Sequence, residues 1–177
     1  SALNNLAISY SDLGDYDKAL ELYNAVYKAF KEILGEKHPD TLTALANLAN
    51  SYSDLGNYSK ALEIENKVYN ARKEILGVNH PDTLKSLANL AISYSDLGDY
   101  SKALEMRNAI YNVRKEILGE KHPDTLTSLA SLAYSYSDLG DYKTALEMRI
   151  AIYNRRKEIL GEKHPDTLSV LSNLACS

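Results

Sequence analysis

The four histidines of this sequence are its first candidates for chemistry, because each begins the same motif, His-Pro-Asp-Thr-Leu. The copies begin at His38, His80, His122 and His164. An imidazole beside a carboxylate could ligate a metal ion or move protons. Successive copies are 42 residues apart each time, so the first question is which elements carry them.

The 42-residue spacing divides the chain into repeats. Repeats 1 to 4 occupy residues 1–42, 43–84, 85–126 and 127–168, and the beginning of a fifth lies at 169–177. At 24 of the 42 positions all four repeats carry the same residue. Residues 1–177 are therefore predicted to form a single repeat array, because internal repetition at this period is typical of solenoids.

Each repeat carries two helical patterns, which we name helix A and helix B. In the helix A that begins at Pro39, apolar residues recur at steps of three and four, which is the period of one helix face. They are Leu42, Leu45, Leu48, Ala49, Tyr52 and Leu55. Gly56 is placed to end this helix in the left-handed backbone region.

Helix B of the same repeat follows at once. Asn57 is placed to cap it, its apolar pattern runs from Tyr58 to Leu76, and Gly77 ends it. Asp15, Asp99 and Asp141 take the capping position in the other repeats. Because no segment alternates as a strand would, we predict nine helices, the last a helix A from Pro165 to about Ala175.

One pair of helices cannot bury its own apolar face, whereas stacked pairs can. The tyrosines support such stacking: 12 of the 14 occupy three repeated positions, namely those of Tyr10, Tyr16 and Tyr27. Aromatic residues at this spacing are typical of packing. The predicted fold is therefore an all-α solenoid of antiparallel helix pairs.

The segment NLANSYSDLGNYSKAL resembles a tetratricopeptide repeat. Its Leu48, Tyr52, Gly56, Tyr58 and Ala61 match the hallmark residues of that family in order and spacing. The resemblance covers the whole chain. It implies a right-handed superhelix whose concave groove is lined by the A helices.

The chain departs from the family pattern at three points. Ala49 stands where the family usually has glycine, and the period is 42 rather than about 34 residues. The usual helix B aromatic is present only as Tyr23 and becomes Glu65, Arg107 and Arg149 in repeats 2 to 4. The period and the His-Pro-Asp start most resemble the repeats of kinesin light chain, and similar arrays occur as sensor tails of large signalling NTPases.

The His-Pro-Asp motif has a structural role at each of its residues. Proline is favoured at the first position of a helix, so His38 is predicted to be the N-cap, with Asp40 in the first turn and Thr41 as a further capping group. J-domain co-chaperones carry this tripeptide between two helices of one small domain, whereas here it begins a helix in an array. We reject the co-chaperone interpretation on that ground.

Catalysis and metal binding are not indicated. Stacked copies of the motif would lie about 10 Å apart, whereas zinc ligands lie about 2 Å from one ion. The serines show no nucleophile turn, and the glycines stand singly rather than in a phosphate loop. We predict no enzyme activity, no cofactor and no metal site.

The composition limits the classes of partner. The net charge is −4 and the pI is near 5.6, which argues against nucleic acid and anionic membranes as ligands. No apolar run approaches the roughly 20 residues of a membrane span. The only cysteine, Cys176, cannot form an internal disulfide, and a cytoplasmic location is expected.

The polar face of the A helices is the predicted ligand-binding groove. Its residues are Asn5, Ile8, Asp12, Asn47, Asn50, Asp54, Asn89, Ile92, Asp96, Ser131, Tyr134 and Asp138. In the kinesin light chain family the groove asparagine contacts the backbone of an extended peptide, and the resemblance assigns that role to Asn5, Asn47, Asn89 and Asn173, with Ser131 departing from it. An amide can both donate to and accept from a peptide unit. The alternative is that these asparagines only avoid clashes between neighbouring A helices.

Two positions of this face carry further hypotheses. Residues Ile8, Asn50, Ile92, Tyr134 and Cys176 vary between near-copies, as ligand selection or tolerance of an unused surface would produce. The aspartates, of which Asp54 is one, either favour basic peptides or bond to the next repeat. The family's clamp for acidic tails is rejected, because Ala46, Ala88 and Ala130 stand where its lysines belong.

The arginines of the B helices are predicted to form a solvated outer stripe. They are Arg72, Arg107, Arg114, Arg149 and Arg156, with Glu74, Glu105 and Glu147 as expected ion-pair partners. In repeat 1 the stripe becomes Tyr23 and Phe30, which are expected to form an apolar patch for docking or a terminal deviation.

The predicted function is therefore a non-enzymatic scaffold that binds an extended peptide or a partner helix. Three alternatives stay open: a regulatory tail of a larger signalling NTPase, head-to-tail self-association through open ends, and a consensus-like array for studying repeat stability that has no partner.

Overall fold

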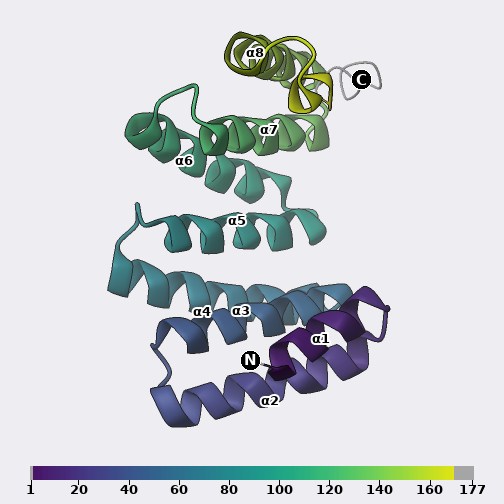
Figure 1. The fold of residues 1–177 in the computed structure, drawn as a ribbon, viewed down its shortest axis with the longest axis vertical. Coiled ribbons are helices and arrows are strands. Elements are labelled where there is room, and N and C mark those ends of the chain that lie inside the picture. Colours follow the sequence, from purple (N-terminus) through teal and green to yellow (C-terminus); the bar gives the residue numbers. More distant parts are fainter. Residues whose placement is uncertain (1, 170–177) are drawn as a thin grey trace. The chain divides into compact units, whose positions relative to one another are not determined.

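A computed structural model describes residues 2–169 of the chain as a succession of helices (Figure 1). They are α1 (Ala2–Asp12), α2 (Tyr16–Leu34), α3 (Pro39–Asp54), α4 (Tyr58–Leu76), α5 (Pro81–Asp96), α6 (Tyr100–Leu118), α7 (Pro123–Asp138) and α8 (Tyr142–Leu160). A further helix occupies 165–169, and the rest of the predicted ninth helix lies outside the described residues. The described part contains no strand, as predicted.

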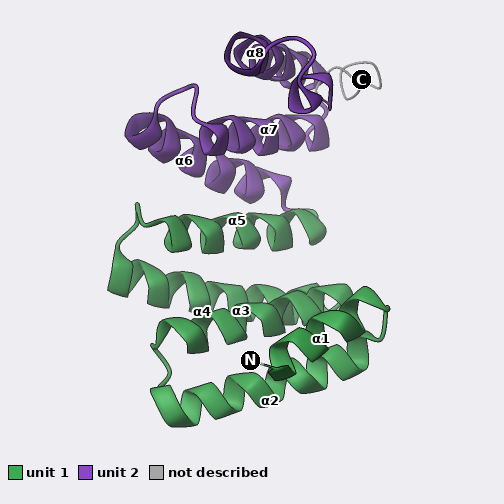
Figure 2. Cartoon of the chain, in the orientation of Figure 1, with its two compact units in different colours: residues 1–98 green, residues 99–177 purple. Residues whose placement is uncertain are grey.

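The helices form two compact units, residues 1–98 with α1 to α5 and residues 99–177 with α6 to α8 (Figure 2). Within each unit, helices pack mainly on their neighbours in the chain: α2 contacts α1 and α3, α4 contacts α3 and α5, and α7 contacts α6 and α8. Packing between neighbours is the arrangement expected of a solenoid. The odd-numbered helices are the A helices and the even-numbered ones the B helices.

The helix starts confirm the capping predictions. The Nδ1 atom of His38 accepts a hydrogen bond from the backbone N–H of Asp40 at 3.2 Å, and Pro39 is the first helical residue. The same bond forms at His80, His122 and His164. Each histidine therefore satisfies a backbone donor that the helix itself leaves without a partner.

The helix ends are also as predicted. Gly56 has φ +75°, and Asn57 donates its backbone N–H to the carbonyl of Tyr52 at 2.8 Å. This bond from the second residue past the cap closes the last turn in a Schellman-type motif. The side chain of Asn57 accepts from the backbone N–H of Lys60, so the residue that closes α3 also begins α4.

The core of the first unit combines small and branched residues from four helices. Ala7, Ala19 and Ala49 are almost fully buried, and Leu48 and Val68 pack among them. An alanine at a helix contact lets two backbones approach closely, while the leucine and valine fill the space beside it. In the second unit, Leu129 and Ile152 form a smaller cluster between α7 and α8.

Some packing predictions are wrong. Thr41 does not cap α3: its hydroxyl is buried and makes no hydrogen bond to any described residue. Leu55 lies just past the end of α3 and is exposed. The tyrosines divide, because Tyr10 and Tyr27 pack against the core, whereas Tyr16 and its repeat copies are exposed at the starts of the B helices.

Replacing His80 with alanine is expected to lower the free energy of unfolding by about 0.5–2 kcal/mol, because the cap of α5 loses its acceptor. His80→Asn should retain most of the stability, since the amide oxygen can take over the bond. Urea unfolding followed by circular dichroism measures both variants. Equal losses for alanine and asparagine would contradict the capping role.

Candidate functional site

The predicted groove residues lie on the A helices α1, α3, α5 and α7. Ile8, Ile92 and Tyr134 are exposed by 42%, 51% and 54%, although they are large and apolar. Asn50 occupies the same repeat position and is also exposed. This variable position is thus turned away from the core. Asn173 and Cys176, which share this face in the sequence, lie outside the described residues.

The groove asparagines are less exposed than this variable position. Asn47 and Asn89 are half-buried, whereas Asn5 is exposed. The side-chain amide of Asn47 donates to the side-chain oxygen of Asn4 at 3.1 Å, which links α3 to α1. Ser131, the exception in this column, donates back to its own helix at the carbonyl of Thr127.

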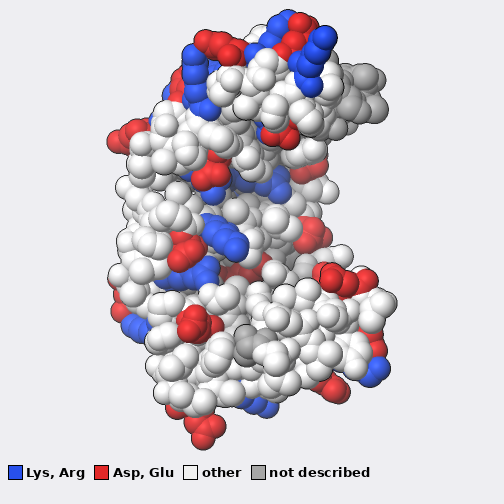
Figure 3. Space-filling model, in the orientation of Figure 1, with Lys and Arg blue, Asp and Glu red and all other residues white. Residues whose placement is uncertain are grey.

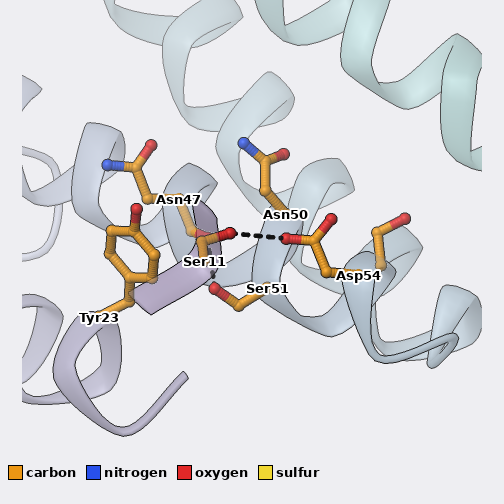
Figure 4. Close-up of a pocket in the computed structure, with 7 residues that line it drawn as sticks. Ser11, Tyr23, Asn47, Asn50, Ser51 and Asp54 are labelled. Atoms are coloured by element: carbon orange, nitrogen blue, oxygen red, sulfur yellow. Dashed lines mark hydrogen bonds between the residues drawn. The ribbon is translucent and has the colours of Figure 1, made fainter. Parts of the chain in front are cut away.

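A cavity of about 370 Å³ opens between α1, α2 and α3. It is lined by Ser11, Tyr23, Asn47, Asn50, Ser51, Ser53 and Asp54. Tyr23, Asn47, Asn50 and Asp54 project to the same side of the helices, around a hydrogen bond from Ser11 to Asp54 (Figure 4). Three of the predicted groove residues, Asn47, Asn50 and Asp54, are therefore brought together by the fold.

The aspartates bond to neighbouring elements, which was the alternative to a purely ligand-facing role. Asp54 accepts from the hydroxyl of Ser11 at 3.4 Å, and Asp96 accepts from Ser53 at 3.5 Å. Asp138 forms an ion pair with Arg107 at 3.8 Å. The first two carboxylates thus hold neutral donors, whereas the third has a cation of its own.

A column of B helix residues faces these A helices and was not predicted to do so. Tyr23 and Glu65 are buried, and Glu65 accepts a hydrogen bond from the hydroxyl of Ser93 at 2.5 Å. Arg107 donates to Ser135 at 2.6 Å in the same way. The signal was available in the sequence, because this position is an aromatic, packed one in the family that the repeats resemble.

The prediction of a solvated arginine stripe is wrong. Arg72 is only 8% exposed and donates to Ser86 on α5 and to Thr43 on α3, at 2.9 and 3.1 Å. Arg114 makes the equivalent bond to Ser128 at 2.8 Å. α2 and α4 each pack against an A helix on both sides, so polar side chains such as Arg72 are covered there.

The other members of the stripe also differ from the prediction. Arg107, Arg149 and Arg156 are half-buried. Glu74 pairs with Lys37 at 2.6 Å rather than with an arginine. Tyr23 is buried and Phe30 is half-buried. The prediction that these two residues form an exposed apolar patch is therefore wrong for Tyr23.

Tyr134 is in contact with one of these arginines. The guanidinium carbon of Arg149 lies 5.7 Å from the centroid of the Tyr134 ring, and Arg149 also donates to Ser137 at 3.1 Å. A cation over the face of a tyrosine is attracted by the ring quadrupole. In the second unit, therefore, two residues of the A helix face are contacted by arginines of the chain itself: Tyr134 by Arg149 and Asp138 by Arg107.

Burial raises the pKa of Glu65 above its ordinary value; the hydrogen bond from Ser93 opposes the shift, and Asp96 adds to it. Because the folded state holds this proton more tightly than the unfolded state, stability falls as the pH rises from the ordinary glutamate pKa through the raised one.

Glu65→Gln is therefore expected to raise the melting temperature at pH 7, because the amide carries no charge to desolvate. The gain should disappear at a pH below the ordinary pKa of glutamate, where both proteins are neutral at this position. Thermal unfolding at a series of pH values measures it. A gain that is independent of pH would contradict the assigned cause.

On the face shown in Figure 3, side chains of both signs of charge are interspersed, with uncharged surface between the charged groups. No group of three or more metal-binding side chains occurs among residues 2–169. Within the same residues, no helix combines the length and the apolar character that crossing a membrane requires.

A tetratricopeptide repeat family model matches residues 1–74, 66–116 and 82–148. Nearly identical TPR-like repeats of a putative kinesin light chain from Podosopora anserina have a TM-score of 0.87 at 27% identity, over 99% of this chain and 83% of that one. BtubC from P. vanneervenii has a TM-score of 0.77 at 22% identity, over 92% and 65% of the two chains. No curated protein matches the chain at a significant level.

A Rap protein complexed with Competence and Sporulation Factor has a TM-score of 0.70 at 14% identity, over 98% of this chain and 52% of that one. At such identity it and BtubC share the fold alone. The family model, by contrast, extends through most of the described helices. Together with the helix pairs and their ends, it shows that the chain belongs to the tetratricopeptide repeat family, whose fold is generally a protein–protein interaction scaffold.

Proposed function

We propose that the A helix face binds an extended peptide or a partner helix, without catalysis. The observation that carries the proposal is the exposure of Ile8, Ile92 and Tyr134 at one repeat position. An exposed apolar side chain at the same place on several A helices is a contact that a partner can cover. The same position varies between repeats that otherwise agree, so successive helices offer different surfaces to a ligand.

The polar groups beside this position suit a peptide backbone. Each amide of Asn47 and Asn89 carries both a donor and an acceptor, and a peptide unit needs both. The cavity at Asn47, Asn50 and Asp54 adds a recess of about 370 Å³ to the face. Backbone bonds of this kind would give affinity, while the variable position would select side chains.

One structural relative supports ligand binding by the fold. The Rap protein was solved in complex with Competence and Sporulation Factor. Its similarity to this chain is one of fold, so it supports the capacity of stacked helix pairs to hold a bound factor.

Asn47→Trp and Asn89→Trp are expected to weaken binding of a selected peptide by about tenfold or more, because each indole would occupy the place of the peptide backbone. The peptide is first selected on the unaltered protein from a random display library. Affinities are then measured by fluorescence anisotropy.

Asn70→Trp is the matched control, since Asn70 is an exposed asparagine of the B helix α4. It should bind the selected peptide with unchanged affinity. If both groove variants bound the peptide as tightly as the control did, the ligand site would not lie on the A helix face.

A further inference from the structure

The cavity of the first compact unit contains a carboxylate with no cation beside it. Asp54 lines the cavity and accepts only a long hydrogen bond, at 3.4 Å, from Ser11. No described lysine, arginine or histidine forms an ion pair with it. Tyr23 and Ser51 complete the wall.

The second compact unit holds the same pair of A helix residues with a different residue opposite. Ser135 and Asp138 on α7 are the copies of Ser51 and Asp54 on α3. Opposite them stands Arg107 of α6, at the position that Tyr23 occupies on α2. Its guanidinium donates to Ser135 at 2.6 Å and lies 3.8 Å from the carboxylate of Asp138. In this unit, an arginine of the chain itself satisfies the serine and aspartate.

We infer that the cavity at Tyr23 and Asp54 binds the guanidinium group of an arginine side chain supplied by the bound peptide. The ligand arginine would occupy, from outside, the place that Arg107 fills from within the chain in the second unit. This inference rests on the proposed peptide-binding function and specifies one side chain of the ligand.

The wall of the cavity suits a planar cation. A guanidinium has five donors in a fixed fork and no acceptor, and the carboxylate of Asp54 and the amide oxygen of Asn50 are acceptors on the same side of the site (Figure 4). The ring of Tyr23 supplies an aromatic surface next to them. The chain already places a guanidinium over an aromatic ring elsewhere, where Arg149 lies over the ring of Tyr134.

The electrostatic environment of Tyr23 agrees with this assignment. Burial raises the pKa of its hydroxyl, and the carboxylates of Asp54 and Asp12 raise it further. Both carboxylates therefore place negative potential on the ring and its surroundings, and a cation entering the cavity would be attracted by it.

The equivalent position between α4 and α5 is built differently. There Glu65 is buried and its carboxylate already holds the hydroxyl of Ser93. In repeat 1 the neutral Tyr23 leaves Asp54 as the acceptor of the cavity. This difference assigns the arginine to one place along the bound peptide.

The test uses N-acetyl-arginine methylamide as the probe and the citrulline analogue as its neutral control of the same shape. Binding to the ¹⁵N-labelled chain is followed by the amide resonances of Asn47 and Asn50, which line the cavity. We expect saturable shifts with the arginine probe and binding about tenfold or more weaker with citrulline, because a charge-assisted bond to a carboxylate is lost.

Two variants locate the site. Asp54→Asn keeps the shape of an exposed side chain and should weaken the arginine probe about tenfold or more. Tyr23→Arg introduces into repeat 1 the arginine that repeat 3 carries at this position as Arg107. This variant should abolish probe binding, since an arginine of the chain itself would then occupy the cavity. Asp17→Asn, an exposed charge change on α2, should leave the probe affinity unaltered.

Equal binding of the arginine and citrulline probes would overturn the inference, as would unchanged affinity in Asp54→Asn, a variant whose folding is checked by circular dichroism. The two proposals can fail separately. Selected peptides that bind the A helix face without needing an arginine would leave the proposed function intact and refute this site. Probe binding in a chain for which no peptide can be selected would refute the proposed function alone.

Discussion

Leu48→Ala is expected to lower the free energy of unfolding by about 2–5 kcal/mol. Leu48 is 6% exposed and packs in the core of the first unit with Ala7, Ala49 and Val68. The small alanines around it cannot expand to fill the space that it leaves. The loss therefore includes both the transfer of its methyl groups and the cavity that remains.

Urea unfolding followed by circular dichroism measures this effect, with Leu13→Ala as the matched control. Leu13 is 80% exposed, so its replacement should change stability by about 0.5 kcal/mol or less. Because helices of a solenoid pack on their neighbours, Leu48→Ala could also separate the unfolding of the two compact units. Similar losses for the two leucines would contradict the assigned core.

Arg72 and Ser86 are expected to show a coupling energy of about 1.5–3 kcal/mol in a double-mutant cycle, as for a hydrogen bond to a charged group. The guanidinium of Arg72 is buried and donates to Ser86 at 2.9 Å. Ser86→Ala leaves the buried cation with the weaker bonds to Thr43 and to the carbonyl of Asp82, at 3.1 and 3.4 Å. Burial also lowers the pKa of Arg72, which reflects the same cost of removing the cation from water.

The chain itself supplies the replacements for the cycle. Phe30 and Ala44 occupy the positions one 42-residue period before Arg72 and Ser86, in repeats 1 and 2 respectively. In the Arg72→Phe background, Ser86→Ala should cost much less, because the hydroxyl no longer accepts from the guanidinium and keeps only its own bond to the carbonyl of Asp82 at 3.0 Å. The four proteins are compared by urea unfolding.

The pair Arg114 and Ser128 in the second unit is the internal comparison. Its bond is 2.8 Å long, but Arg114 is half-buried rather than buried, so water can replace part of the interaction. Its coupling energy should be smaller than that of Arg72 and Ser86. Additive effects within about 0.5 kcal/mol at Arg72 and Ser86 would show that the buried bond contributes nothing specific.

The sequence by itself determined the helices and their ends. The 42-residue return of His-Pro-Asp-Thr-Leu located the starts of the A helices from Pro39 onward, and the glycines located the stops. These features could be predicted because they are local: a cap such as His38 bonds to a residue two positions away, and Gly56 needs only its own backbone angle. The apolar face of each helix A could be predicted for the same reason, because its residues recur at a regular spacing within one helix.

The candidate site was predicted only in part. The A helix positions followed from the repeat, and the cavity contains Asn47, Asn50 and Asp54 among them. Tyr23 was missed as a wall of that cavity, because its position carries a glutamate or an arginine in the other repeats. A column of such mixed residues gives no hydrophobic signal, although Glu65 and Arg107 both bond to the serine at the same place on the following helix A.

Only the tertiary structure decided where the polar residues of the B helices lie. Arg72 bonds to serine and threonine side chains on two different A helices, 14 and 29 residues away in the chain. α2 and α4 each contact an A helix on both sides, and the bonds of Arg72 to α3 and α5 show that polar side chains take part in these contacts. Hydrophobic periodicity detects burial only where the buried residues are apolar. It therefore identifies the apolar part of such a helix contact and not the polar part. The physical reason is that a buried arginine or glutamate is stable only when distant partners satisfy it, and those partners are brought together by packing.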